Sequence, residues 1–135
     1  MEHYYTNNPT TESREKTINS TIANENFKFY TDNGVFSKES VDFGTKTMLE
    51  SFNTEKENAQ VADIGCGYGV ISIFLAKKYP TFKFTMVDVN NRVLELSRKN
   101  IELNKIDNEV EVLESSSFDN VKGTFDIVLT NPPII

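Results

Sequence analysis

A short glycine-rich segment, Asp63-Ile64-Gly65-Cys66-Gly67-Tyr68-Gly69, constrains the fold of this chain more than any other feature. It follows the apolar residues Val61 and Ala62 and opens into a second apolar run, residues 70–76. Glycine adopts positive φ angles without steric cost, so this pattern predicts a strand, a tight turn and a helix. Such a turn lets the backbone approach a ligand closely, and the N-terminus of the following helix favours an anionic group.

The alternation of strand and helix continues toward the C-terminus. We predict four strands and two helices, the strands at 60–64, 82–87, 110–113 and 125–130 and the helices at 69–79 and 91–104. Strands joined by helical crossovers indicate an α/β fold, with a doubly wound, mostly parallel sheet and helices on both faces. The last strand is apolar on both faces, and the chain ends at Ile135. We therefore expect a sheet truncated after its fourth strand, with an unpaired edge that promotes self-association.

The N-terminal residues predict an extension of this domain. Residues 1–24 are polar, with no regular element expected. Phe27 and Phe29 alternate with polar residues, and Asp32-Asn33-Gly34 supplies the positive φ angles of a tight turn, which predicts a β-hairpin over 25–36. Ser37 is the expected N-cap of a helix that runs to about Phe52.

Composition excludes several classes of protein. Hydrophobic residues make up 38% and charged residues 25% of the chain, which is typical of a soluble globular protein. No apolar run approaches the length of a membrane helix, and the N-terminus lacks the order of a signal peptide. The net charge of −6 argues against a nucleic-acid partner, because phosphate contacts require basic residues, although an acidic chain can carry a local basic face.

Cys66 is the single cysteine, which excludes an intrachain disulfide and fits a reducing cytoplasm. The single histidine, His3, is far away in the sequence, so Cys66 has no evident base. We interpret Cys66 as a small residue beneath the glycine turn, and we expect no metal site.

Two carboxylates follow neighbouring strands of the predicted sheet. Asp63 ends the first strand, and Asp88 follows the second, where a carboxylate can accept hydrogen bonds from both hydroxyls of a ribose. The pattern D-x-G-x-G-x-G has Val70 at the position of the third glycine of a dinucleotide turn. Taken singly, Asp63 is equally well explained as a strand-end cap and Asp88 as a turn residue. Together they favour a nucleoside-containing cofactor.

A second motif, Asn131-Pro132-Pro133, follows the last predicted strand, at the edge where ligands bind in such sheets. The amide oxygen of Asn131 and the carbonyl of Pro132 can both accept hydrogen bonds from one amine, which then presents its lone pair to an electrophile. A proline-terminated strand with a turn is the alternative interpretation.

These motifs resemble those of the class I S-adenosylmethionine-dependent methyltransferases, which have a Rossmann-like sheet of seven strands. The resemblance implies S-adenosyl-L-methionine as cofactor, with Asp63 near its amino-acid end, Asp88 on its ribose and Val89 against its adenine. Ser116 takes the place of an Asp that commonly holds the adenine amine. The expected cofactor-binding residues are therefore Asp63, Gly65, Gly67, Gly69, Asp88, Val89 and Ser116.

The C-terminal motif resembles the (N/D)PP(Y/F) signature of amino-methyltransferases, with Ile134 in place of the aromatic residue. The segments 29–37 and 41–45, with His3-Tyr4-Tyr5, resemble the leader of the bacterial 16S rRNA guanine-N2 methyltransferases, in their short single-domain branch. This resemblance implies that Asn131 and Pro132 are catalytic and that Ile134 and Phe36 contact the substrate.

The resemblance thus implies methylation of a flipped 16S rRNA guanine in the small ribosomal subunit, in the cytoplasm and without a metal or a membrane. Residues 1–58 would be the hairpin and helix extension, and residues 59–135 the N-terminal half of the cofactor-binding methyltransferase domain. Two alternatives remain: a release-factor glutamine N5-methyltransferase, and an inactive fragment that binds the cofactor.

Overall fold

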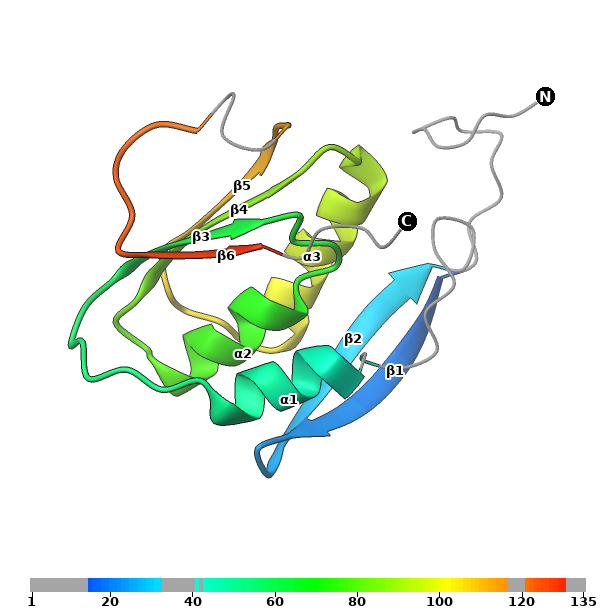
Figure 1. Ribbon diagram of the computed structural model, residues 1–135. Coiled ribbons are helices and arrows are strands. Elements are labelled where there is room, and N and C mark those ends of the chain that lie inside the picture. Colours follow the sequence, from blue (N-terminus) through cyan, green and yellow to red (C-terminus); the bar gives the residue numbers. More distant parts are fainter. Residues whose placement is uncertain (1–14, 33–40, 42, 117–120, 131–135) are drawn as a thin grey trace.

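The computed structural model describes residues 15–32, 41, 43–116 and 121–130, which form an α/β fold (Figure 1). Its elements follow the chain in the order β1 (Glu15–Ile22), β2 (Glu25–Asp32), α1 (Phe43–Ser51), β3 (Gln60–Ile64), α2 (Val70–Lys78), β4 (Lys83–Asp88), α3 (Asn91–Leu103), β5 (Val110–Glu114) and β6 (Ile127–Thr130). Strands β3 to β6 form a parallel sheet in the order β5-β4-β3-β6, whereas β1 and β2 form a separate antiparallel hairpin. The predicted α/β fold class is confirmed.

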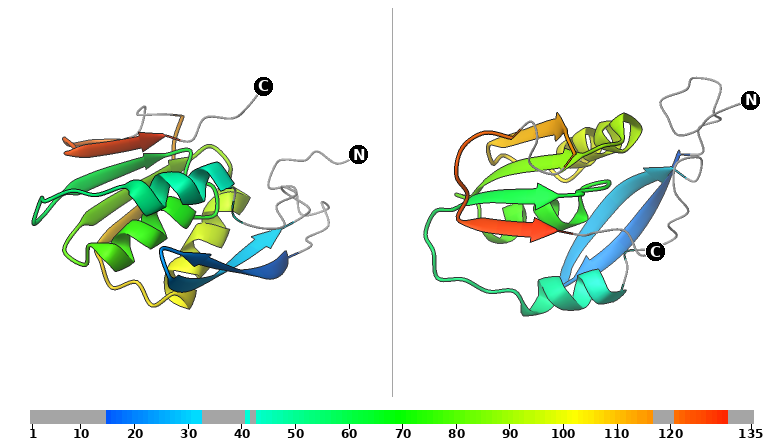
Figure 2. Two further views of the ribbon diagram at one scale, coloured as in Figure 1. Left: turned by 60° about the horizontal axis from the view of Figure 1, so that its bottom comes forward. Right: turned by 45° about the horizontal axis from the view of Figure 1, so that its top comes forward.

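The parallel sheet positions the ends of its strands side by side. Residue Ile64 at the end of β3 pairs with Val87 of β4 on one side and with Thr130 of β6 on the other. The connections from β3 to β4 and from β4 to β5 step in the same direction along the sheet. Because such crossovers are right-handed, α2 and α3 lie on the same face (Figure 2). Helices on the opposite face remain a prediction.

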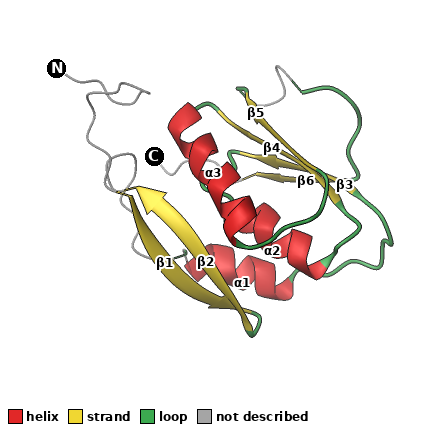
Figure 3. Cartoon of the chain, turned by 180° about the vertical axis from the view of Figure 1, so that it is seen from behind, coloured by secondary structure: helices red, strands yellow, loops and turns green. Residues whose placement is uncertain are grey.

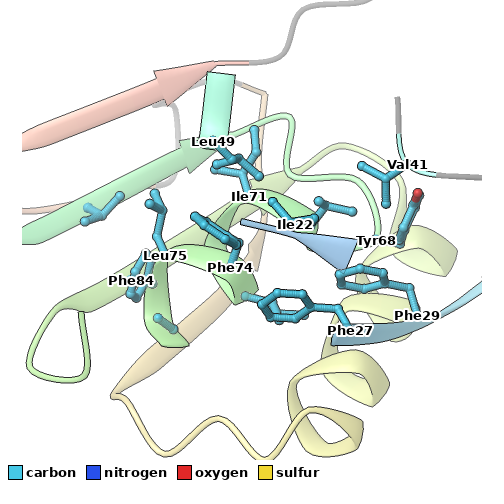
Figure 4. Close-up of a cluster of buried hydrophobic side chains, with 14 of the residues drawn as sticks. Ile22, Phe27, Phe29, Val41, Leu49, Tyr68, Ile71, Phe74, Leu75 and Phe84 are labelled. Atoms are coloured by element: carbon cyan, nitrogen blue, oxygen red, sulfur yellow. The ribbon is translucent and has the colours of Figure 1, made fainter. Parts of the chain in front are cut away.

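Helix α2 is apolar all round because it is covered on two sides. Its residues 70–76 are all buried. One side packs on the sheet through Phe84, while Phe74 meets Phe27 of the hairpin with ring centroids 5.8 Å apart (Figure 4). The hairpin therefore forms a third layer, on the side of the helices away from the sheet (Figure 2). A helix without a polar stripe is expected in such a buried middle layer.

The predicted N-terminal hairpin is confirmed, but the described hairpin pairs β2 with a strand that precedes it, and the predicted turn and return strand after β2 remain a prediction. Strand β2 confirms the alternation of Phe27 and Phe29, but it pairs with residues 15–22, which the sequence predicted to be irregular. The turn lies at Ala23 and Asn24, with φ angles of 51° and 67°. The signal was weak because β1 buries only Ile18 and Ile22 among polar residues, and alanine rarely adopts a positive φ. Residues 33–36 lie outside the described residues.

Helix α1 begins later than the sequence predicted. Val41 was expected inside the helix but is a buried residue before it, and the helix runs over Phe43–Ser51 with Leu49 as its buried residue. The first helical turn was misplaced because Ser37 offered an attractive N-cap, and Ser37 itself lies outside the described residues. Seen from behind, α1 lies below α2 and beside the hairpin, and it contacts both α2 and β1 (Figure 3).

Strand β6 is at one end of the sheet and, within the described sheet, pairs with β3 alone. Val128 on this strand is 47% exposed. Self-association through β6 remains a prediction. Among the helices that the structure describes, none is both long and apolar enough to cross a bilayer.

The turn at Ala23 predicts a measurable strain. Because glycine adopts a φ of 51° without a Cβ clash, Ala23→Gly should raise the free energy of unfolding by about 0.5–1 kcal/mol. Ala23→Val should lower it, since a β-branched side chain is worse at positive φ. Urea unfolding of both variants checks this, and a valine variant as stable as the parent would contradict the turn assignment.

Candidate cofactor-binding site

The loop between β3 and α2 is built by backbone contacts to the neighbouring strand β4. The amides of Gly65 and Cys66 both donate to the carbonyl of Val87, each at 2.9 Å. Gly65, Gly67 and Gly69 all have positive φ angles, of 75°, 57° and 105°. The sequence-predicted turn is therefore confirmed, and it lies at the carboxyl edge of the sheet.

The second and third glycines of the loop serve different purposes. A Cβ built on Gly67 meets no atom within 4 Å, so the space beside it is open to a ligand. A Cβ on Gly69 would lie 3.1 Å from Cδ1 of Ile73 and 3.3 Å from Cε of Met86. Gly69 is thus required for the close packing of α2 on the sheet, whereas Gly67 leaves a cradle for a ligand.

Asp88 joins the glycine loop to the start of α3. Its Oδ2 accepts a hydrogen bond from the amide of Gly67 at 3.0 Å, and its Oδ1 accepts one from the amide of Asn90 at 3.1 Å. Each carboxylate oxygen has a further lone pair, so two donors can bind a carboxylate that is already oriented. Val89 beside it is 63% exposed and offers an apolar surface. A ribose with a flat base next to it fits this arrangement.

Asp63 is a fully buried carboxylate with one unpaired oxygen. Ser72 donates its hydroxyl to Oδ2 at 2.6 Å, while Oδ1 has no hydrogen-bond partner among the described residues. Burial raises the pKa of Asp63 to about 6; the Ser72 bond opposes the shift and Asp88 adds to it. A cationic ligand nearby would favour the charged form. This chemistry fits the ammonium of an amino-acid ligand.

Ser116 is the last of the predicted cofactor-binding residues, and Cys66 lies within the loop as the single cysteine. The amide of Ser115 donates to the carbonyl of Asp88 at 3.0 Å, so the chain leaving β5 runs beside the carboxylate, and Ser116 follows as an exposed residue. Cys66 is buried, and burial, together with Asp63 and Asp88, raises the pKa of its thiol. A thiol held neutral is a poor nucleophile, which agrees with its interpretation as a small residue beneath the turn.

Sequence reasoning missed the polar residues that hold the loop from below. The hydroxyl of Ser97 donates to the carbonyl of Gly67 at 2.6 Å, and Nδ2 of Asn100 donates to the carbonyl of Tyr68 at 2.8 Å. Both residues lie on α3 and are fully buried. Polar residues on the inner face of an amphipathic helix were the available signal, because buried polar groups need partners.

The predicted acceptor residues Asn131, Pro132 and Ile134 and the predicted substrate contact Phe36 lie outside the described residues. Strand β6 nevertheless ends at Thr130, which pairs with Ile64, the residue directly before the glycine loop. Among the described residues, no group of three His, Cys, Asp or Glu side chains is placed to hold a metal ion.

The fold is that of a Rossmann-like α/β protein, with the glycine loop and Asp88 at the carboxyl edge of its parallel sheet. The family model of the methyltransferase small domain matches residues 26–135, which is most of the chain. The chain therefore belongs to the methyltransferase small domain family. This family uses S-adenosylmethionine, which confirms the sequence-based assignment of the cofactor.

Two curated proteins are similar to this chain in sequence. YbxB, an uncharacterised protein of Bacillus subtilis (strain 168), is 42% identical over 98% of this chain and 67% of its own length. Ribosomal RNA small subunit methyltransferase C of Yersinia pestis (strain Pestoides F) is 39% identical over 74% of this chain. The matched part is 28% of the Yersinia enzyme, so the chain spans a minor part of that relative.

Two solved structures have the same fold. The 16S rRNA N2 methyltransferase RsmC of T. thermophilus, in complex with AdoMet and guanosine, matches 95% of this chain and 35% of its own, with a TM-score of 0.77 and 24% identity. Methanocaldococcus jannaschii Trm5, in complex with adenosine, matches 91% of this chain and 36% of its own, with a TM-score of 0.67 and 20% identity. At these identities the likeness shows the fold alone.

The two glycines predict separable effects of substitution. Gly67→Ala should fold, with a loss of about 1 kcal/mol in the free energy of unfolding because residue 67 has a positive φ. Its methyl group would enter the space beside the loop and should weaken cofactor binding at least tenfold. Gly69→Ala should instead lose stability by about 2 kcal/mol or more through crowding and a φ of 105°. Calorimetric titration and urea unfolding of both variants measure this, and equal cofactor affinity of Gly67→Ala and the parent would refute the cradle.

Asp63 predicts a pH-dependent stability of the cofactor-free protein. Its folded pKa of about 6 lies above the ordinary 3.8, so the folded chain holds this proton more tightly than the unfolded chain. The contribution of this group is complete below about pH 4 and is lost as the pH rises through about 6, by on the order of 3 kcal/mol.

Asp63→Asn removes this titration. Unfolding measured from about pH 4 to pH 7 should show the stability difference shifting in favour of the variant as the pH rises. A difference that does not change with pH would show that Asp63 does not titrate in this window.

Proposed function

We propose that this protein transfers a methyl group from S-adenosylmethionine to the exocyclic N2 of a guanine in 16S rRNA. The observation that carries the proposal is the carboxylate of Asp88, held by the amide of Gly67 at the edge of the sheet where β6 also ends. The family membership supports methyl transfer, and the 39% identity to a small-subunit rRNA methyltransferase supports the class of substrate.

The glycine loop and its two carboxylates would hold the cofactor. Asp88 would accept the ribose hydroxyls, and Val89 and Ser116 would lie along the adenine. Asp63 would offer negative charge toward the amino-acid end, while Gly65, Gly67 and Gly69 would allow the close approach of the backbone. Bound in this way, S-adenosylmethionine supplies an electrophilic methyl group on its sulfonium.

The segment after β6 would hold the acceptor. Asn131 and Pro132 would accept the two hydrogens of the guanine amine, which turns the nitrogen lone pair toward the methyl group. Ile134 and Phe36 would contact the flipped base, since a base inside an RNA helix cannot reach the pocket. Methyl transfer would break the bond between the methyl carbon and the sulfonium sulfur and leave S-adenosylhomocysteine, while the amine nitrogen, which gains the carbon–nitrogen bond, would lose one proton to solvent.

A protein substrate is the second candidate. The net charge of −6 favours it, because an acidic chain is an unusual partner for RNA. The same clamp can align the amide of a glutamine side chain, as the sequence interpretation allowed. Ile134 in place of an aromatic residue and the likeness of residues 29–45 to rRNA methyltransferases favour the guanine.

Incubation of the protein with labelled S-adenosylmethionine and unmethylated small ribosomal subunits tests the proposal. Nucleoside analysis of the RNA should find the label in N2-methylguanosine, and Asn131→Ala should lower the rate at least a hundredfold because the amine loses its alignment. Label in release factor but not in RNA would favour the glutamine candidate. An Asn131→Ala variant at the parental rate would exclude the proposed clamp.

A further inference from the structure

Two buried asparagines, Asn100 in α3 and Asn104 at its C-cap, bind the main chain of β2. Oδ1 of Asn100 accepts from the amide of Tyr30 at 2.7 Å, and its Nδ2 donates to the carbonyl of Tyr30 at 3.1 Å. One turn later, Asn104 makes the same pair of bonds to Lys28, at 3.3 and 2.8 Å. The side-chain amides therefore replace the partner strand that the outer edge of β2 would otherwise need.

The two asparagines differ in the use of their remaining hydrogen. Nδ2 of Asn104 donates it to the carbonyl of Asn100, within the same helix, at 2.9 Å. Nδ2 of Asn100 donates it to the carbonyl of Tyr68, in the glycine loop, at 2.8 Å. Asn100 is fully buried and thus links the hairpin, α3 and the loop through one side chain.

Two further contacts join the hairpin to the site. The ring of Phe29 meets the ring of Tyr68 edge to face, with centroids 5.7 Å apart. Arg92, two residues after the N-cap Asn90, forms an ion pair with Asp32 at the end of β2 at 3.2 Å, and both side chains are largely buried. The hairpin therefore contacts both segments that donate to Asp88, which are the glycine loop and the start of α3.

We propose that Asn100 is a positioning residue for the cofactor, because it makes the conformation of the glycine loop depend on the docked hairpin. The carbonyl of Tyr68 lies between Gly67 and Gly69, whose backbone has little stiffness of its own. A hydrogen bond to this carbonyl restricts the peptide planes on both sides. The inference rests on the proposed function in so far as the loop is the cofactor site.

Asn104 supplies a matched control. Asn104→Ala removes two bonds to β2, at Lys28, just as Asn100→Ala removes two bonds at Tyr30. Unlike Asn100→Ala, it removes no bond to the loop. Asn100→Asp, nearly isosteric, keeps the acceptor for the amide of Tyr30 but, when ionised, loses the donors to the carbonyls of both Tyr30 and Tyr68. All three variants should lose stability in urea unfolding. If the proposal holds, both Asn100 variants also bind S-adenosylmethionine about tenfold more weakly, whereas Asn104→Ala binds it as the parent does.

Calorimetric titration of the folded variants decides between the two roles. Equal affinity in the Asn100 and Asn104 variants would overturn the proposal and leave Asn100 with a structural role only. Parental protein that fails to bind S-adenosylmethionine would instead contradict the proposed function.

Native-state hydrogen exchange without cofactor gives an independent measurement on the parental chain. The amide of Tyr30 is bonded to Asn100, and the amide of Gly69 is bonded to the carbonyl of Cys66 at 3.1 Å. If the hairpin and the loop are coupled, both amides exchange through one cooperative opening. Their opening free energies are then equal and decrease together as urea is added. The proposal would be overturned if the amide of Gly69 opened at a distinctly lower free energy than the amide of Tyr30 and this free energy did not change with urea. This test does not require the variants to fold.

Discussion

The hydrogen bond from the amide of Gly67 to Asp88 is the contact on which the site depends. It joins the loop after β3 to the end of β4, and Asn90 holds the other carboxylate oxygen at the start of α3. A carboxylate free to rotate would need to be ordered by its ligand at an entropic cost. Here the backbone orients it beforehand, and each oxygen keeps a further lone pair that could accept a hydrogen bond from a ligand.

The hairpin turns a two-layer α/β arrangement into three layers. Without it, α2 would expose Phe74 and much of its apolar surface, and Asn100 would lose the two bonds to Tyr30 that hold its side chain as it donates to the carbonyl of Tyr68. The hairpin covers this surface with Phe27 and Phe29 and, through Asn100, reaches the underside of the glycine loop. The same extension therefore contributes to both the core and the site.

The local signals in the sequence were sufficient where one element carried its own pattern. The glycine turn and all four parallel strands were predicted within a few residues, because glycine spacing and apolar runs report local geometry. Strand β1 was missed because its stability comes from pairing with β2 and from packing, not from its own composition. Ser97 and Asn100 were visible as polar residues on the inner face of α3, but their partners were not predictable, since these lie about 30 residues or more away along the chain. The predicted roles of Asn131, Pro132, Ile134 and Phe36 stay predictions.

A crystal structure of the protein with S-adenosylhomocysteine would test the central claim most directly. The account predicts both ribose hydroxyls within hydrogen-bond distance of Asp88, the adenine along Val89, and the amino-acid end over Gly67 toward Asp63. A nucleoside bound elsewhere, or a ribose that does not contact Asp88, would contradict the account.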